Sequence, residues 1–301
     1  MKSKFLASVA LFGLVASNAM AIDFSKFGGD VEIGYKEKNY DYEEAGASRN
    51  FREENVALTL KPNKEKGLAF KFAYADRDFY DNKNNESRET YEFYVENMYI
   101  WGKLMFRPEI GIKLVDFHND SIKLDSSTEY RFYPKFTYSI NRNWSLYSRG
   151  YVAYTELKGA FFESKGQNND GFKHRLEGGA RYKFNRKHAV SVAIFDENSG
   201  VNKFDYDVEG SQLRFRYHYS PTRDLKVVPY FFKGFHGSRV STSGGRDNVQ
   251  RDKLGVNLHY DVTKTFELIG KINHEWRDDD SSNAGGNKNH MFYSLGAKIS
   301  F

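Results

Sequence analysis

The last eleven residues of the chain alternate large apolar side chains with small or polar ones. Apolar side chains occupy Met291, Tyr293, Leu295, Ala297, Ile299 and Phe301. Successive side chains of a strand point to opposite faces, so these six residues share one face. The other face holds Ser294, Gly296, Lys298 and Ser300, with Phe292 as the exception. This pattern predicts a strand with one apolar face and one polar face.

The same alternation recurs along the chain in runs of about 9–12 residues, without helical periodicity. Tight turns such as 141–143 and 185–187 alternate strictly with longer polar stretches such as 156–170, 197–204 and 236–249. Six short turns and seven long loops imply fourteen strands. The predicted strands begin near residues 29, 51, 67, 89, 104, 128, 144, 171, 188, 205, 225, 250, 266 and 290. We therefore expect an all-β, transmembrane, antiparallel up-and-down barrel with short periplasmic turns and longer external loops.

The first residues have the three parts of a secretory signal peptide. Lys2 and Lys4 precede an apolar run over 5–15, and Ala19-Met20-Ala21 forms a small-residue cleavage site. The apolar run is too short to cross ~30 Å of hydrocarbon. We predict a signal peptide over 1–21, a single barrel domain over 22–301, and location in a bacterial outer membrane.

Composition agrees with a barrel better than with a soluble or disordered chain. Mean hydropathy is −0.71, yet 17% of the residues are aromatic, which disordered chains lack. A large barrel reconciles these values, because its lumen and loops are wet and only a belt contacts lipid. The chain has no cysteine, and its net charge of +5 gives no indication of nucleic-acid binding.

If the apolar parity faces lipid, the other parity lines the lumen. The predicted basic wall is Arg131, Lys135, Arg149, Arg175, Arg181, Arg214, Arg216, Arg251 and Lys253. The predicted acidic wall is Glu32, Glu53, Glu92, Glu96, Glu267 and Glu275. Facing walls of opposite charge would set the ion preference of a watery pore. The alternative is that these charges only pair and fill the lumen, but fourteen strands enclose more space than side chains fill.

Three prolines fall within predicted strands, where each removes a ladder hydrogen bond. Pro108, Pro134 and Pro229 therefore predict β-bulges.

The C-terminal strand, the length of 22–301 and the strand count together resemble the outer membrane protein G family of monomeric porins. In that family, the positions matching Tyr293, Leu295, Ile299 and Phe301 form a signal for the outer-membrane assembly machinery. The resemblance implies a monomeric, non-selective channel for ions and mono- or oligosaccharides, in contact with outer-membrane lipid and lipopolysaccharide. It also implies that the sixth external loop, mapped to 236–249, gates the mouth.

The residues that we assign to this gating loop are His236, Arg239, Gly244, Gly245 and Arg246. The family's acid gating uses facing histidines near the loop. No such pair is found here, because His236 begins the loop and His259 lies near the opposite end of the next strand.

Other functional classes have less support. An adhesin or surface-recognition barrel using its loops is one alternative, and a porin specific for acidic oligosaccharides is another. The only local stretch with catalytic residue types is 118–121, whose Asn, Asp and Ser are ordinary turn formers. We predict no enzymatic activity, no cofactor and no metal site. Conductance in planar bilayers would separate a channel from a silent barrel.

Overall fold

The computed structural model describes residues 26–40, 50–63, 67–80, 86–118, 124–159, 170–199, 208–240, 246–279 and 289–301. The predicted signal peptide over 1–21 lies outside these residues. Within the described ranges, there is no helix whose length and apolar character would let it span a membrane.

Antiparallel strands account for nearly all of the described residues. The first half of the chain forms β1 (Gly28–Tyr40), β2 (Phe51–Lys61), β3 (Ala69–Phe79), β4 (Ser87–Glu96), β5 (Tyr99–Trp101), β6 (Leu104–His118) and β7 (Leu124–Ser139). The second half forms β8 (Trp144–Gly159), β9 (Asp170–Lys183), β10 (His188–Ser199), β11 (Val208–Tyr219), β12 (Leu225–Val240), β13 (Arg246–Asp261), β14 (Phe266–Asp279) and β15 (His290–Ser300). β4 and β5 are two parts of one crossing, because both pair with β6 in a common register.

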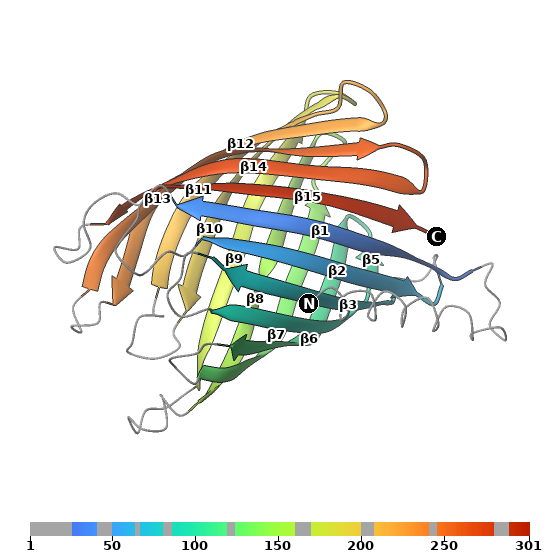
Figure 1. Cartoon of the computed structure of the whole chain (residues 1–301). Coiled ribbons are helices and arrows are strands. Elements are labelled where there is room, and N and C mark those ends of the chain that lie inside the picture. Colours follow the sequence, from blue (N-terminus) through green and yellow to red (C-terminus); the bar gives the residue numbers. More distant parts are fainter. Residues whose placement is uncertain are drawn as a thin grey trace.

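Each crossing pairs with the next along the chain, and the ring is completed by β1 against β15 (Figure 1). At this closing pair, Gly29 N donates to Phe301 O at 3.1 Å and Phe301 N donates to Gly29 O at 3.0 Å. The described residues thus form a closed antiparallel barrel of fourteen strands, which confirms the predicted fold class. Every predicted strand start lies within four residues of the observed one.

Burial in this barrel is inverted relative to a soluble protein. In β10, Ala189, Ser191 and Ala193 are 3–4% exposed, whereas the alternate residues Val192 and Ile194 are 41% and 59% exposed. The exposed parity is apolar in other strands as well, and Leu295 and Ile299 of β15 are 65% and 55% exposed. The outer surface is therefore an apolar face suited to lipid, and small or polar side chains point inward.

Aromatic rings gather on the outside near the short turns. Trp144 lies 4.8 Å from Tyr182, measured between ring centroids, and Tyr182 lies 4.9 Å from Phe184. Trp101 and Tyr99 stack at 5.6 Å beside the next short turn. Rings of this kind suit the boundary between hydrocarbon and water.

The prolines do not produce the predicted bulges. Pro108 and Pro134 are direct partners across β6 and β7, and the register passes through them unchanged. Asn97 N donates to Pro108 O at 3.1 Å, so Pro108 directs its backbone polar groups away from β7. The β7–β8 ladder likewise lapses between Phe132 and Phe136 and then resumes in the same register.

Pro229 behaves in the same way, being paired with β13 while the ladder to β11 lapses between Arg216 and Tyr219 without a shift. The bulge prediction is therefore wrong at all three prolines. When the side of a proline that lacks an N–H donor faces an unpaired stretch of the neighbouring strand, no ladder hydrogen bond is lost and no β-bulge with its extra residue is needed. The register shifts among the described strands lie elsewhere, at Leu124/Ser126, Ser211/Gln212 and Phe232/Ser238.

One inward glycine makes room for a buried ring at the seam between β4 and β6. Gly111 is the direct partner of Tyr94, whose side chain is 6% exposed. A Cβ on Gly111 would lie 2.1 Å from Phe93 O and 2.3 Å from Tyr94 Cδ1. The ring of Tyr94 therefore occupies the space that any other residue at 111 would need.

We predict that Gly111→Ala destabilises the barrel by about 1–3 kcal/mol, because the added methyl group overpacks the wall. Urea unfolding of the detergent-folded protein, followed by tryptophan fluorescence, measures this change. Gly178→Ala is the matched control, because nothing lies within 4 Å of the position that its added methyl group would take. Equal midpoints for the two variants would contradict the close fit of Tyr94.

Candidate functional site

The inward face of the barrel is built around buried carboxylates, each held by cationic side chains from neighbouring strands. An ionised carboxylate out of water is costly unless it is paired and hydrogen-bonded. The strand alternation supplies the partners, because inward residues of adjacent strands lie close together.

Glu177 of β9 is the most buried of these carboxylates, at 2% exposure. Arg149 Nη2 of β8 lies 2.7 Å from its Oε1, and Arg214 Nη1 and Arg216 Nη2 of β11 lie 2.9 and 2.8 Å from its Oε2. Tyr147 Oη donates to the same carboxylate at 3.2 Å. One negative charge thus holds three guanidinium groups, which leaves this part of the wall positive.

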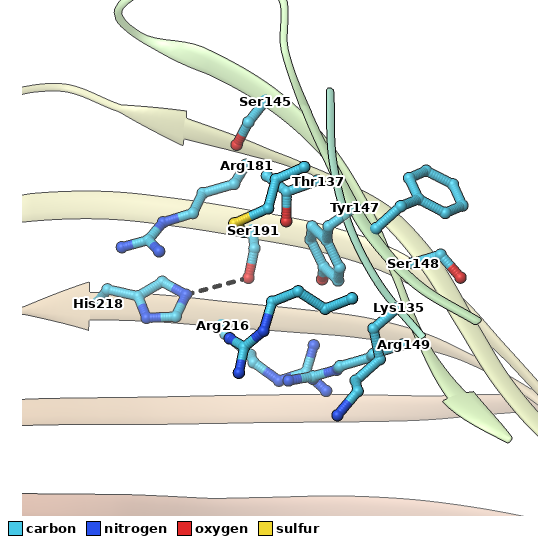
Figure 2. A pocket seen from close by; sticks show the side chains of 13 residues that line it. Lys135, Thr137, Ser145, Tyr147, Ser148, Arg149, Arg181, Ser191, Arg216 and His218 are labelled. Atoms are coloured by element: carbon cyan, nitrogen blue, oxygen red, sulfur yellow. Dashed lines mark hydrogen bonds between the residues drawn. The ribbon is translucent and has the colours of Figure 1, made fainter. Parts of the chain in front are cut away.

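A recess of about 310 Å³ hollows the wall beside this cluster (Figure 2). Its cationic lining residues are Arg107, Lys135, Arg149, Arg181 and Arg216. Neutral polar groups and two apolar residues, Met105 and Phe136, complete the lining. In Figure 2 Ser191 and His218 lie next to each other, with Ser191 Oγ 3.2 Å from His218 Nε2. We call this feature the cationic recess.

Two carboxylates share three cations where β3, β4, β6 and β7 meet. Lys135 Nζ lies 2.5 Å from Glu96 Oε2 and 2.9 Å from Glu109 Oε2. Lys71 bridges the same pair of carboxylates, and Arg107 contacts Glu96. Glu96 and Glu109 are 3% and 5% exposed, so both depend on these partners.

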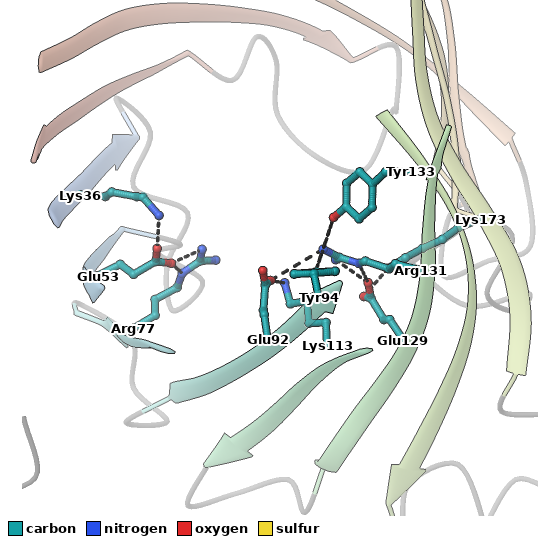
Figure 3. Close-up of polar contacts among 10 residues, drawn as sticks. All are labelled: Lys36, Glu53, Arg77, Glu92, Tyr94, Lys113, Glu129, Arg131, Tyr133 and Lys173. Atoms are coloured by element: carbon teal, nitrogen blue, oxygen red, sulfur yellow. Dashed lines mark hydrogen bonds and ion pairs between the residues drawn. The ribbon is translucent and has the colours of Figure 1, made fainter. Parts of the chain in front are cut away.

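A second network surrounds Arg131 of β7 (Figure 3). Arg131 Nη2 lies 2.5 Å from Glu129 Oε2, and Lys173 of β9 contacts the other oxygen of that carboxylate. Arg131 Nη1 donates to Tyr94 Oη and Tyr133 Oη, each at 3.1 Å. The network joins strands from β4 to β9 on one side of the lumen.

Glu53 of β2 forms a separate cluster, also drawn in Figure 3. Lys36 Nζ of β1 and Arg77 Nη2 of β3 each lie 2.5 Å from its carboxylate oxygens. Arg77 also lies over the ring of Phe51, with 4.1 Å between Cζ and the ring centroid. This carboxylate, predicted as part of an acidic wall, is therefore enclosed by positive charge.

The remaining predicted wall residues follow the same rule of local pairing. The ion pairs are Arg175 and Arg251 with Glu197, Lys253 with Glu275, Lys298 with Glu267, and Lys113 and Arg131 with Glu92. No ion pair is recorded for Glu32 or Arg181 among the described residues. Five of the predicted acidic residues thus have cationic partners, whereas cations outnumber carboxylates along β7–β11.

The sequence prediction left out the carboxylates that organise the basic side. Glu129 and Glu177 have the inward parity of Arg131 and Arg175, so counting both signs of charge on that parity would have found them. Glu197 was placed in a predicted loop over 197–204, but β10 extends through Ser199. The strand alternation therefore contained the signal for two of these three carboxylates, Glu129 and Glu177.

The predicted gating loop is shorter than expected. His236 and Arg239 lie in β12, and Arg246 begins β13. Gly244 and Gly245 lie outside the described residues. On β12, His236 is ten residues from Lys226, the partner of His259, which separates the two histidines by about 33 Å along the strand. His236 and His259 therefore do not form a facing pair.

The described residues offer no assembled metal site, because no group of three or more His, Asp or Glu side chains converges among them. His118 ends β6, and 119–121 lie outside the described residues. On β15, Tyr293, Leu295 and Ile299 lie on the exposed outer parity, and Phe301 is 49% exposed beside Gly29.

Sequence comparison finds no matching family of known proteins and no matching curated protein. Solved structures do match in shape. The CymD monoaromatic hydrocarbon channel has a TM-score of 0.55 at 7% identity, covering 92% of this chain and 88% of its own. The toluene transporter TodX of Pseudomonas putida has a TM-score of 0.51 at 9% identity, covering 91% of this chain and 89% of its own. The toluene transporter TbuX of Ralstonia pickettii has a TM-score of 0.53 at 8% identity, covering 92% of this chain and 90% of its own. At these identities the likeness shows the fold alone.

We predict that Glu177→Gln lowers the free energy of unfolding by about 3 kcal/mol, because three arginines then lose their shared buried counter-charge. Asp252→Asn is the control. Its pair with Lys233 lies 2.6 Å apart on the outside, with side chains 26% and 53% exposed, and is worth under about 1 kcal/mol. Urea titration of both variants measures the difference. If Glu177→Gln shifted the urea midpoint no more than Asp252→Asn does, the assigned role of Glu177 would be contradicted.

Proposed function

We propose that this protein is an outer-membrane porin that lets ions and small hydrophilic solutes, including mono- and oligosaccharides, diffuse passively. The observation that carries the proposal is the charged inner face of a closed fourteen-strand barrel whose outer face is apolar. A barrel of this size encloses more space than side chains fill, and a polar interior favours water. All described residues belong to strands or short connections, and none forms an inserted plug domain.

The proposed membrane and orientation follow from the connections. The short turns, such as 141–143 and 185–187, lie at the barrel end where β1 begins and β15 ends. In outer-membrane barrels this end faces the periplasm. The finer assignment to the outer membrane protein G family, with a monomeric channel and the C-terminal strand as assembly signal, stays part of the proposal.

The positive excess along β7–β11 leads us to propose a preference for anions. In a narrow watery pore, fixed charge raises the local concentration of counter-ions. Arg149, Arg175 and Arg181 can be neutralised without leaving a buried carboxylate unpaired. Glu177 keeps its ion pairs with Arg214 and Arg216, and Glu197 keeps its ion pair with Arg251.

We predict that the triple variant Arg149→Gln, Arg175→Gln, Arg181→Gln shifts permeability toward cations by about threefold or more, since each kT of lost potential changes counter-ion concentration by that factor. The reversal potential of planar bilayers in a KCl gradient reports the shift. The control neutralises three exposed turn residues, Arg142, Arg186 and Arg223, whose charges are screened by bulk salt. An unchanged reversal potential in the lumen variant would refute the basic-wall assignment, and absence of conductance in the wild type would refute the channel.

We also propose that the hairpin of β12 and β13 controls opening. Its outer pairs, Ser238 with Asn248 and Val240 with Arg246, are separated from the rest of the β12–β13 ladder by an interruption and a one-residue shift after Phe232. The outer part of β12 is paired with β11, across a register shift of its own at Ser211/Gln212. An interrupted ladder forms a joint about which the outer pairs can move.

Removing residues 239–247 should therefore reduce spontaneous closures in single-channel recordings, because the outer pairs of the hairpin are lost. A deletion of 200–206, in the connection between β10 and β11, is the control. If the frequency of closures in both deletion variants equals that of the wild type, the hairpin is not a gate.

A further inference from the structure

The cationic recess combines features that a wall of paired charges does not need. None of its lining residues is a carboxylate. Arg107, Lys135, Arg149 and Arg216 contact Glu96, Glu109 or Glu177, and those carboxylates lie outside the lining. The faces that these cations turn to the recess therefore meet no negative charge.

Arg181 differs from these four cations, because it has no ion pair with any described residue and is exposed to the lumen. It faces a space that Figure 2 shows bounded by Arg216, Tyr147 and His218. Holding several cations together costs free energy through mutual repulsion, and a guest anion removes that cost.

The backbone explains why the wall is hollowed here, because the two proline-linked lapses, in the β7–β8 and β11–β12 ladders, both border the recess. Arg107 precedes Pro108, Lys135 follows Pro134 in the unpaired stretch of β7, and His218 lies in the unpaired stretch of β11. Within the lapse between β7 and β8, Gly150 has φ of +110°, and a Cβ there would lie 1.9 Å from Arg175 O. The recess is thus built into the strand pairing.

Neutral hydrogen-bonding groups stand beside the cations. His218 Nδ1 is buried and has no hydrogen-bond partner among the described residues, while Nε2 is next to Ser191. Tyr147, Ser145 and Thr137 add hydroxyl groups to the lining. A bare anion would use only the guanidinium groups, whereas a hydroxylated solute uses both sets.

We propose that the cationic recess is a subsite for the carboxylate end of a sugar acid, which it holds transiently during passage. The inference rests on the proposed channel function and names one solute class for it. Arginine forks match a carboxylate in two-point geometry, and the hydroxyl groups and Tyr147 accommodate the ring. The volume of about 310 Å³ lies near the lower limit of roughly 300 Å³ for small-ligand sites.

The experiment measures binding and current on the same folded protein. Saturation-transfer NMR in detergent measures binding of glucuronate, with glucose and inorganic phosphate as comparison probes. Planar bilayers measure current block by the same three solutes. We expect millimolar binding and block by glucuronate, at least tenfold stronger than by glucose and stronger than by phosphate.

Two charge-matched variants locate the effect. Arg181→Gln should weaken glucuronate binding about tenfold, because one charge-assisted contact is lost without exposing a buried carboxylate. Lys271→Gln is the control. Lys271 lies on β14, 5.1 Å from the centroid of Phe292, has no recorded ion pair among the described residues, and does not line the recess. It should leave binding within twofold.

Each contrary result identifies what fails. Equal weakening by the two variants would overturn the recess as a site and leave only the general lumen charge. Phosphate binding as strong as glucuronate binding would overturn the sugar-acid assignment. A barrel that binds glucuronate but conducts no ions would refute the channel and leave the recess, whereas conduction with glucuronate no better than glucose would refute the recess alone.

Discussion

The constraint on which this structure depends is that backbone hydrogen-bonding groups facing hydrocarbon have no water to replace a missing partner. A sheet meets that constraint only when it closes, and the reciprocal hydrogen bonds between Gly29 and Phe301 join the two chain ends of the ring. Once closed, alternation divides every strand into a lipid side and an inner side. The buried carboxylates of the inner side are then removed from bulk water, and each requires cations within reach.

Local ion pairing and net charge therefore have different effects on the inner wall. Glu53 with Lys36 and Arg77, or Glu96 and Glu109 with Lys71 and Lys135, hold neighbouring strands together across the inner face. Where cations exceed carboxylates, as around Glu177, the surplus charge is available to solutes. Rigidity and the proposed ion preference thus depend on the same side chains, in different proportions around the ring.

The sequence was sufficient for the features that depend on alternation. Strand number, strand starts and the lipid-facing parity of Leu295 and Ile299 all follow from a period of two against an apolar exterior. The period disappears where a strand leaves the apolar belt, since both faces are then wet. For that reason Glu197 and His236 were predicted in loops although they belong to β10 and β12. Which cation meets which carboxylate depends on the register between strands, and a single strand does not contain that information.

The facing pair of Pro108 and Pro134 has a mechanical consequence. Each proline lacks the N–H that would donate across the outer flank of its strand. On the β6 side Asn97 N still donates to Pro108 O, whereas the β7–β8 ladder lapses between Phe132 and Phe136, so the outer flanks of β6 and β7 both lose donors at one level of the wall. Hydrogen bonds between strands are what resist bending of a barrel wall around its circumference. The cross-section is therefore more compliant at this level than along the continuous ladders of β1, β2 and β15, and lateral pressure from the bilayer would flatten the ring here before it deformed those ladders.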